Sequence, residues 1–425
     1  MSRVEYCHRV SRGYFGKNES VGVIMKKTRY FLLALLAVSL APLIVLISVR
    51  GSAPDAPATA AGEKSSAAAE TAPAPPPPSV VTFMAAGDNL IHKPLFRQAK
   101  ERARGGAAYD FTPAYAGVKP ILARADLAMI NQETPIASAV AAVSSYPMFC
   151  SPAEAGDAVY NLGFRAVGLS NNHMLDKGAK GAAASLDYWA SKPGVCAFGA
   201  YRDAADSLRP HTLTVNGIKF AFVGATFSYN GLQLPSGSAL VLPLLEQEEL
   251  LRQMISIARE NADVVVVAPH WGTEDSTTVH ETQKALARKF VDWGADLVIG
   301  THPHVLQTME YLEKPGGGQA FVAYSLGNFI SGQRRAPNLV GGILELTVEK
   351  DNETGAVTVR APRLYPTVTQ YEQGYGNVRL IPWTSYTQAL GRAHGVRGSD
   401  SRFGYAWAEG FLKQVVPGEF LAMGE

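Results

Sequence analysis

Residues 296–305 read D-L-V-I-G-T-H-P-H-V and join a short apolar run to a pair of histidines. The apolar residues 297–299 are typical of a buried strand, and the glycine that follows ends it. Side chains at i and i+2 of an extended backbone point to the same side, and Pro303 biases His302 towards extended geometry. His302 and His304 are therefore predicted to direct two imidazoles at one point, as a metal site requires. Taken alone, an H-x-H pair is also compatible with two polar loop residues.

Apolar runs of this kind alternate with helix-like segments from residue 80 onwards. Runs that end in polar residues lie at 80–89, 126–133, 165–173, 263–270, 296–304 and 320–328, with further strand-like runs at 218–225, 339–349 and 356–364. The helix-like segments between them cover residues 152–163, 178–191, 245–261 and 282–293. This alternation predicts an α/β fold, and the continuous Val/Ile/Leu runs predict strands that are buried on both faces of a sheet.

The polar residues at the ends of the predicted strands have side chains that bind metal ions. They are Asp88, Glu133, Asn172, His173, His270, His302, His304 and Asn328. Sites in open α/β sheets assemble at the carboxyl ends of strands, so these side chains are expected to converge. Carboxylate, amide and imidazole groups together suit one or two divalent transition ions (Mn, Fe or Zn) better than Mg or Ca. Asp88 alone could instead cap the helix that follows it.

Composition excludes some classes of function. The chain has 425 residues, of which 47% are hydrophobic and 18% charged, with a formal net charge of +2. This is enough for one large domain or two ordinary ones. A near-neutral chain without a clustered Lys/Arg face argues against a nucleic-acid partner. The three cysteines form no C-x-x-C motif, although Cys150 and Cys196 could pair in an exported protein.

The N-terminal region indicates a membrane protein. Residues 30–49 form an uncharged apolar run that is long enough to span a bilayer as a helix. Basic residues precede it, so residues 1–29 are predicted to be cytoplasmic and the bulk of the chain extracytoplasmic. An uncleaved signal anchor in the cell membrane is the preferred interpretation, and secretion after signal cleavage is the alternative. Met25 would make a natural start for such a segment, which makes residues 1–24 a candidate for a misassigned start.

The rest of the chain divides by composition. Residues 50–79 are Ala/Pro-rich and are expected to act as an extended linker. Residues 80–375 carry the predicted strands and the candidate ligands, and they are expected to form the folded domain. Residues 376–425 are expected to pack on that domain as a C-terminal extension.

Six motifs in this order resemble those of the CapA-type poly-γ-glutamate capsule biosynthesis proteins. They are G-D at 87–88, N-x-E at 131–133, N-N-H-x-x-D-x-G at 171–178, H-W-G-x-E at 270–274, G-x-H-P-H-V-x-Q at 300–307 and Y-S-L-G-N-F at 324–329. The resemblance covers roughly residues 80–370. Because that family is similar to the calcineurin-like metallophosphoesterases, it implies a two-sheet α/β/β/α sandwich with metal ions at the strand ends.

The resemblance also implies roles for individual residues. His173 would be the catalytic histidine, with Asp176 as its orienting partner. The implied metal ligands are Asp88, Glu133 (as the bridging carboxylate), Asn172, His270, His302 and His304. The candidates for a substrate pocket are Trp271, Glu274 and Asn328. Two departures from the superfamily are visible: Leu90 replaces the histidine of its D-x-H motif, and N-x-E replaces G-D-x-x-D. His92 lies close by, but its spacing does not match the motif.

Two functions are compatible with these features. The first is a membrane-anchored, metal-dependent, hydrolase-like protein that serves synthesis, transport or remodelling of an anionic surface polymer such as poly-γ-glutamate. The second is a non-catalytic subunit that binds the polymer, or partner subunits of a membrane synthase or export complex. The intact histidine set favours the first, and the missing D-x-H histidine favours the second.

Overall fold

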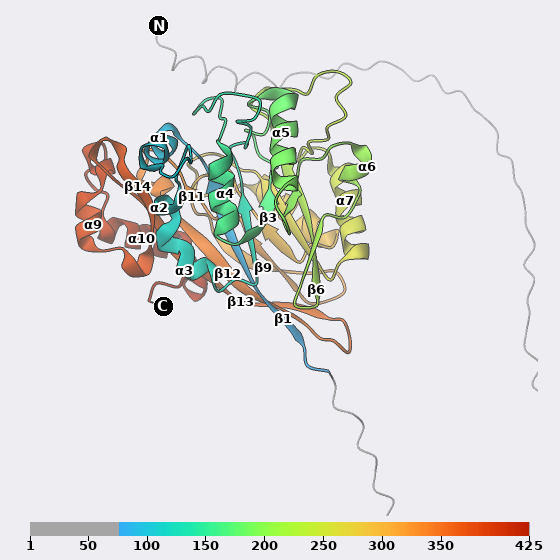
Figure 1. Ribbon diagram of the computed structural model, residues 1–425. Coiled ribbons are helices and arrows are strands. Elements are labelled where there is room, and N and C mark those ends of the chain that lie inside the picture. Colours follow the sequence, from blue (N-terminus) through green and yellow to red (C-terminus); the bar gives the residue numbers. More distant parts are fainter. Residues whose placement is uncertain (1–75, 425) are drawn as a thin grey trace, which may run out of the picture. The chain divides into compact units, whose positions relative to one another are not determined.

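Two β-sheets pack face to face in residues 76–424, the part of the chain that the computed structural model describes (Figure 1). The first sheet has the order β14-β13-β12-β1-β2-β3-β4, with β11 paired to β1. Its strands are β1 (Ser79–Asn89), β2 (Leu127–Asn131), β3 (Phe164–Gly168), β4 (Cys196–Phe198), β11 (Asn328–Ile330), β12 (Val340–Lys350), β13 (Val357–Glu372) and β14 (Gly376–Pro382). The second sheet has the order β5-β6-β7-β8-β10-β9. Its strands are β5 (Thr212–Val215), β6 (Ile218–Thr226), β7 (Val264–His270), β8 (Leu297–Ile299), β9 (Met309–Glu313) and β10 (Gln319–Ala323).

The centres of both sheets are parallel and buried. β1, β2, β3 and β4 run parallel to one another, as do β6, β7 and β8. Every residue of β7 is buried, because the sheet is covered on both faces. Aromatic rings pack between the sheets: Phe83 stacks on Phe220 at 6.0 Å between ring centroids, and Phe198 on Phe222 at 5.2 Å. The predicted mixed α/β fold with two sheets is confirmed.

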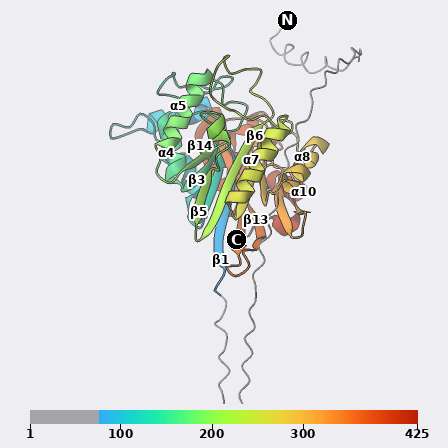
Figure 2. The same ribbon diagram turned by 90° about the vertical axis from the view of Figure 1, so that its right-hand side faces the viewer.

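Helices cover the outer faces of the two sheets (Figures 1 and 2). The α-helices are α1 (Lys93–Arg102), α2 (Thr112–Tyr115), α3 (Lys119–Leu122), α4 (Ala153–Asn161), α5 (Gly178–Ala190), α6 (Ala204–Ser207), α7 (Glu248–Asn261), α8 (Glu281–Asp292), α9 (Gln388–Ala393) and α10 (Tyr405–Val415). Short 3-10 helices are η2 (Ala116–Val118), η3 (Ala336–Leu339), η4 (Gln373–Tyr375), η5 (Trp383–Ser385), η6 (Gly395–Gly398) and η7 (Gly418–Phe420). Helices α4 and α5 contact the first sheet, and α7 and α8 contact the second.

The sequence of α7 explains how such a helix attaches to its sheet. Its buried residues are Leu251, Met254, Ile255 and Ala258. These positions are i, i+3, i+4 and i+7, so they form one apolar stripe on the helix. The stripe packs with strand residues of the second sheet in a cluster that is separate from the core between the sheets.

The predicted membrane segment, residues 30–49, lies outside the described residues. Within residues 76–424, no helix has the length and apolar character needed to cross a bilayer. Cys150 and Cys196 are both buried and both free, so the possible disulfide between them is not formed. Each thiol is therefore part of the packed interior.

The C-terminal residues contribute to the sheet as well as packing against it. Strand β14 pairs antiparallel with β13, beyond the boundary expected at residue 375. Helices α9 and α10 follow, and Leu412 of α10 is fully buried. The sequence of residues 376–425 did not predict these helices or this strand.

His394, directly after α9, is a buried neutral histidine that fixes part of this region. Its Nε2–H donates to the carbonyl of Thr369 at 2.9 Å, and its Nδ1 accepts from the backbone N–H of Val396 at 3.1 Å. The ring packs between Tyr371 and Phe403, at 4.5 and 4.7 Å between centroids. Burial lowers the pKa of His394 from 6.5 to about 4. Protonation would place a proton on Nδ1, which is the acceptor for Val396.

Acidification is therefore expected to destabilise the fold through His394. The folded-state pKa lies below the unfolded value, so the imidazole is neutral in both states above pH 6.5, and the unfolded state binds the proton first between pH 6.5 and about 4. The melting temperature should fall over this window, and His394→Gln should show a smaller fall. Thermal melts of both proteins at stepped pH values measure the difference, with exposed His280→Gln as the control. Parallel curves for His394→Gln and wild type would contradict this assignment.

Candidate metal centre

The predicted ligands meet where the carboxyl ends of the two sheets come together. Asp88 lies at the end of β1 and pairs in register with Asn131 at the end of the neighbouring strand β2. Glu133 follows β2 by two residues, and His270 is the last residue of β7. The loop after β8 carries His302 and His304. Parallel strands aligned in this way bring the side chains that follow them to one edge.

Two groups of three side chains each have the spacing of metal ligands. Asp88, Glu133 and His270 each offer an atom within 4.8 Å of the others, and so do Glu274, His302 and His304. His304 connects the groups: its Nδ1 lies 3.0 Å from Asp88 Oδ2, and its Nε2 lies 3.6 Å from Glu133 Oε1.

The distances to Glu133 fit shared coordination of one cation. His270 Nε2 lies 3.8 Å from Glu133 Oε1, and His304 Nε2 lies 3.6 Å from it. Both distances are too long for hydrogen bonds. Two ligands of one tetrahedral cation, each about 2.1 Å from it, are about 3.4 Å apart. The arrangement therefore resembles ligands around a common ion more than a hydrogen-bonded cluster.

Three buried ligand atoms have no hydrogen-bond partner among the described residues: both carboxylate oxygens of Glu133 and Nδ1 of His302. A buried charged or polar atom without a partner costs free energy, so native structures rarely leave one unexplained. Glu133 and His302 belong to different candidate groups, so divalent cations at the two groups would satisfy these atoms. The donor set therefore fits a divalent metal ion; the structure does not identify the element.

Electrostatics support the same conclusion. Burial raises the pKa of Glu133 well above its usual value; His304 opposes this shift and Asp88 adds to it. Burial lowers the pKa values of His270 and His302, with the neighbouring histidines adding to the shift, so both imidazoles are neutral near pH 7. Burial alone would lower the pKa of His304, but Glu133 and Asp88 outweigh it and raise that pKa to about 10. Neutral imidazoles such as His270 and His302 coordinate transition metals, and the two carboxylates that raise the pKa of His304 would also stabilise a bound cation.

The backbone conformation of the H-P-H loop, residues 302–304, differs from the extended one predicted. His302 and His304 have φ values of +98° and +58°, so His302 is not extended. Positive φ is uncommon for non-glycine residues and stores strain, which concentrates at functional sites. Asp88 contributes to holding the loop, because its Oδ2 accepts from the backbone N–H of His302 at 3.3 Å and contacts His304 Nδ1. The convergence of the two rings therefore depends on Asp88 and not on an extended H-x-H.

Polar neighbours orient the ligands. Asn131 Nδ2 donates to Asp88 Oδ1 at 2.8 Å, and Thr301 Oγ1 lies 2.9 Å from His270 Nδ1. The oxygen of Asn172 lies 3.0 Å from His270 Nε2, which places this predicted ligand at the edge of the group. Asn131 was not singled out from the sequence, although it opens the N-x-E motif.

His173 and Asp176 form a pair beside the ligands. His173 Nδ1 donates to Asp176 Oδ2 at 2.8 Å, and the same oxygen accepts from the backbone N–H of Phe149 at 2.6 Å. The Phe149 ring packs edge-on against the imidazole at 4.7 Å. No hydrogen bond to His173 Nε2 occurs among the described residues, so this atom is the one available for proton transfer.

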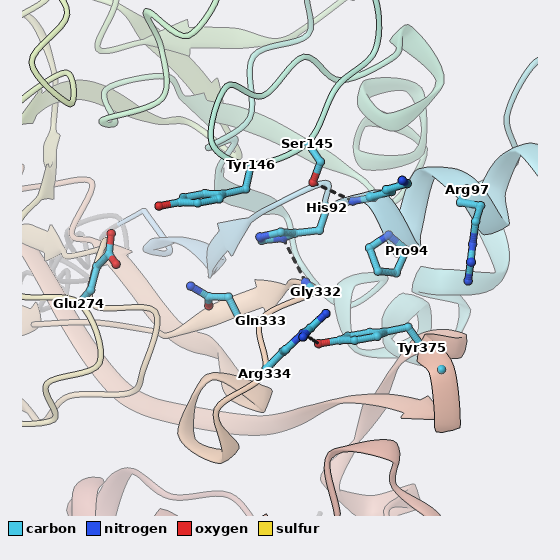
Figure 3. A pocket seen from close by; sticks show the side chains of 12 residues that line it. His92, Pro94, Arg97, Ser145, Tyr146, Glu274, Gly332, Gln333, Arg334 and Tyr375 are labelled. Atoms are coloured by element: carbon cyan, nitrogen blue, oxygen red, sulfur yellow. Dashed lines mark hydrogen bonds between the residues drawn. The ribbon is translucent and has the colours of Figure 1, made fainter. Parts of the chain in front are cut away.

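The three candidates for a substrate pocket have different environments. Glu274 is exposed and lines a cavity next to His302 and His304 (Figure 3). Trp271 is buried, donates from Nε1 to the Tyr324 carbonyl at 2.9 Å, and lines a second cavity. Asn328 pairs in register with Asp88, but its amide donates to residues of the 331–338 loop. Its amide nitrogen therefore supports that loop, while its buried Oδ1 has no hydrogen-bond partner among the described residues.

Two positions near the ligands differ from the superfamily pattern. Leu90 is a buried apolar residue and supplies no ligand. The Nδ1 of His92 accepts from the backbone N–H of Gly332 at 3.1 Å, and His92 is in neither group of candidate ligands. His92 therefore does not replace the missing histidine.

Phe227 was not predicted as part of the site. It follows β6, its side chain is 43% exposed, and its ring lies 4.3 Å from that of His302. An exposed aromatic ring against a candidate ligand forms an apolar wall at the entrance. Polar residues at strand ends do not indicate this position, because Phe227 is itself apolar.

Known proteins similar to this chain share its motifs. The family model for bacterial capsule synthesis proteins, PGA_cap, matches residues 82–333, more than half of the chain. The capsule biosynthesis protein CapA of Bacillus anthracis is 36% identical over 188 residues, which is 41% of this chain and 42% of that protein. The PGA biosynthesis protein CapA of Bacillus subtilis is 32% identical over 201 residues, 47% of this chain and 50% of that protein.

The matched part of the chain thus spans half or less of the length of these relatives. A solved structure of a novel phosphatase from Mycoplasma pneumoniae superposes with a TM-score of 0.41 at 14% identity, covering 68% of this chain and 94% of that one. The ordered motifs and the family match agree over the same residues. The chain belongs to the bacterial capsule synthesis protein family PGA_cap, and its motifs are those of CapA-type proteins.

Proposed function

We propose that this protein is a CapA-type capsule biosynthesis protein whose metal centre catalyses hydrolysis during synthesis, transport or remodelling of an anionic surface polymer such as poly-γ-glutamate. The observation that carries the proposal is the buried convergence of Asp88, Glu133, His270, His302 and His304 with unpartnered ligand atoms. The two-sheet architecture with ligands at strand ends supports a likeness to calcineurin-like metallophosphoesterases.

Different residues of the chain would bind the metal, donate the proton and exclude water. Asp88, Glu133, Asn172, His270, His302 and His304 would hold one or two divalent ions (Mn, Fe or Zn). When bound, the cation would supply Lewis-acid polarisation of a carbonyl or phosphoryl oxygen. His173 would protonate the leaving group through Nε2, and Asp176 holds its imidazole in the Nδ1–H tautomer. Phe227 and the surrounding apolar side chains would restrict water around the reacting group.

The remainder of the proposal concerns place and partners. An N-terminal helix at residues 30–49 would anchor the protein in the cell membrane with the described domain outside, unless signal cleavage releases it. Polymer and other capsule synthase subunits are the proposed partners, and no nucleic acid is among them. The 50–79 linker would hold the domain away from the bilayer.

A non-catalytic role is the second candidate, and Leu90 is the observation that favours it. This residue fills the D-x-H histidine position with a buried apolar side chain, so one ligand of a two-metal site is missing. In that case the fold would bind polymer or partner subunits within a synthase or export complex.

Metal content tests the proposal. His302→Ala and His304→Ala are each expected to lower the affinity for Mn, Fe or Zn at least tenfold, because each removes a buried ligand. Elemental analysis of the purified full chain after equilibration with each metal measures this, with hydrolysis of phosphoester and γ-glutamyl substrates assayed in parallel. His280→Ala, an exposed histidine outside the cluster, is the control. Unchanged metal content in both loop variants would refute the ligand assignment.

A further inference from the structure

A cavity of about 540 Å³ opens beside the candidate metal centre (Figure 3). Glu274 lies at one end of it, and Arg97 and Tyr375 lie at the other. Its walls come from segments far apart in the sequence: the start of α1, the 145–146 loop, the 332–334 loop and the 374–375 turn. We call this cavity the basic groove, because Lys93, Arg97 and Arg334 line it and Glu274 is its only acidic residue.

Two of the cations are presented by one face of a helix. Lys93 and Arg97 are the first and fifth residues of α1, so they are i, i+4 neighbours about 6 Å apart along the helix. Both are exposed. Arg97 makes only a long contact of 3.8 Å with Glu101, and the two side chains are 51% and 63% exposed. Within residues 76–424, no carboxylate pairs with the Lys93 ammonium.

The third cation is held in place by an aromatic ring. Arg334 Nε donates to the Tyr375 hydroxyl at 3.0 Å, and its guanidinium lies 5.4 Å from the centre of that ring. No carboxylate among the described residues pairs with Arg334. The next residue behaves differently, because Arg335 forms an ion pair with Asp275. Arg334 is thus positioned over the groove while its charge remains available.

An uncharged donor lies between the cations and the metal centre. His92 lines the groove, and its Nδ1 accepts from Gly332, so the proton of the neutral ring is on Nε2. The ring packs edge-on against Phe149, which also packs edge-on against His173. Burial lowers the pKa of His92 to about 4, which keeps the ring neutral near pH 7. His92 is therefore a hydrogen-bond donor suited to a carbonyl or carboxylate oxygen.

We propose that the basic groove binds a polycarboxylate chain next to the metal centre, with Lys93, Arg97 and Arg334 pairing with successive carboxylates and His92 donating to the group nearest the ligands. This rests on the proposed function and assigns its specificity to residues outside the metal site. The cations are distributed along the groove on two separate elements, which suits a chain with one charge per unit better than a compact anion. Their exposure lets a chain enter from solvent.

The expected affinity effects follow from this exposure. A single exposed ion pair changes an equilibrium constant by a factor of about 1.4–5. The triple variant Lys93→Glu/Arg97→Glu/Arg334→Glu replaces three attractions by three repulsions, so we expect a loss of roughly 100-fold at low salt. The loss should shrink at high salt, because exposed charges are screened.

Fluorescence anisotropy of the purified full chain with a labelled γ-linked oligoglutamate tests the groove. The matched control is Arg252→Glu/Arg402→Glu/Lys413→Glu, which makes the same change of net charge at exposed cations on α7, the 400–404 turn and α10. Melting temperatures confirm that both triple variants fold. An uncharged probe, the same γ-linked oligomer with its free α-carboxylates converted to amides, should bind neither variant nor wild type.

Three outcomes would overturn the assignment. The first is an equal loss of affinity in the groove variant and the control. The second is wild-type binding of the amidated probe. The third is tighter binding of inorganic polyphosphate than of oligoglutamate, with the same loss in the groove variant, which would assign the groove to phosphate anions.

Elemental analysis of the same samples separates this proposal from the proposed function. A wild-type protein that binds oligoglutamate through the groove but retains no metal would support the groove and refute the metal-dependent hydrolase. If the protein is metal-loaded and the groove variant binds oligoglutamate like wild type, the groove assignment is refuted and the metal-dependent hydrolase is retained.

Discussion

Replacing His173 with asparagine is expected to lower the turnover of a hydrolysable substrate by roughly 10²–10⁴-fold, the range lost when a general acid is removed. The imidazole is 6% exposed and contacts Asp176 through Nδ1, which leaves Nε2 available for the proposed proton transfer. Asparagine keeps a polar side chain of similar reach but cannot supply the proton. Metal content should stay at the wild-type value, because His173 is in neither group of candidate ligands.

Asp176→Asn provides the matching test of positioning. The backbone N–H of Phe149 and the imidazole both donate to Asp176 Oδ2, and an amide oxygen can accept both bonds but carries no negative charge to stabilise a protonated imidazole. We expect a smaller loss than for His173→Asn, together with a shift of the acidic or basic limb of the pH–rate profile. A purely structural role would lower activity without moving that profile.

These variants also decide between the two candidate functions. Steady-state kinetics with metal-loaded wild type, His173→Asn and exposed His280→Asn give the comparison. If metal-loaded wild type hydrolyses none of the phosphoester or γ-glutamyl substrates, the non-catalytic role is favoured. If His173→Asn retains full activity, the leaving group is protonated by some other residue.

Much of the metal centre could be predicted from the sequence because it lies at strand ends. The apolar runs before His270 and His302 each predict a buried strand. A polar residue that follows such a strand lies at the edge of the sheet where the strand ends. The family motifs then order these ends along the chain. Positions set by chain direction and hydrophobic pattern are therefore predictable without coordinates.

Features that depend on contacts across the two sheets could not be predicted. The positive φ values of His302 and His304 arise because Asp88, from the other sheet, bonds to the loop between them. The extended geometry predicted for His302 from Pro303 is wrong, and the hydrogen bond from its backbone N–H to Asp88 joins the loop to the other sheet. Glu274 lies close to His302 and His304, and Arg334 bonds to Tyr375. Each contact joins segments that are far apart in the sequence, so no local sequence pattern predicts it.

The C-terminal region shows the same limitation. Strand β14 completes the edge of a sheet whose first strand, β1, lies far earlier in the chain. Burial alternates from Val378 to Pro382, but the sequence hides this alternation because the half-buried Ile381 is also apolar. Such a strand is defined by its partner β13 more than by its own sequence. Helix α9 is short, and its cap comes from the Thr387 side chain.

Gly87→Ala and Gly300→Ala are expected to destabilise the fold and weaken metal binding together. A Cβ at Gly87 would lie 1.8 Å from the Gly327 carbonyl oxygen, which accepts from the Asp88 backbone N–H at 3.0 Å. A Cβ at Gly300 would lie 2.1 Å from the Tyr324 oxygen and 2.4 Å from Trp271 Nε1, the two atoms of one hydrogen bond. Neither backbone neighbour can move aside without shifting the strand that carries it.

Overpacking of this kind costs about 1–3 kcal/mol and more where backbone must shift, so we expect a loss of about 3 kcal/mol for each variant. For a domain of this size, that corresponds to a fall in melting temperature of roughly 4 °C. Denaturant and thermal unfolding of the full chain measure the change. Metal content is then compared well below both melting temperatures, so that unfolding does not contribute.

Gly410→Ala is the control for these glycines. It lies within α10, and a Cβ there would meet no atom within 4 Å. Because alanine is favoured over glycine in a helix interior by up to about 1 kcal/mol, this variant should be slightly more stable than wild type. A Gly300→Ala protein that melts like wild type but loses metal would show that the glycine serves the H-P-H loop alone. A protein that keeps both properties would contradict the close approach of β8 and β10 at this point, and with it the backbone position that directs His302 and His304 towards Asp88.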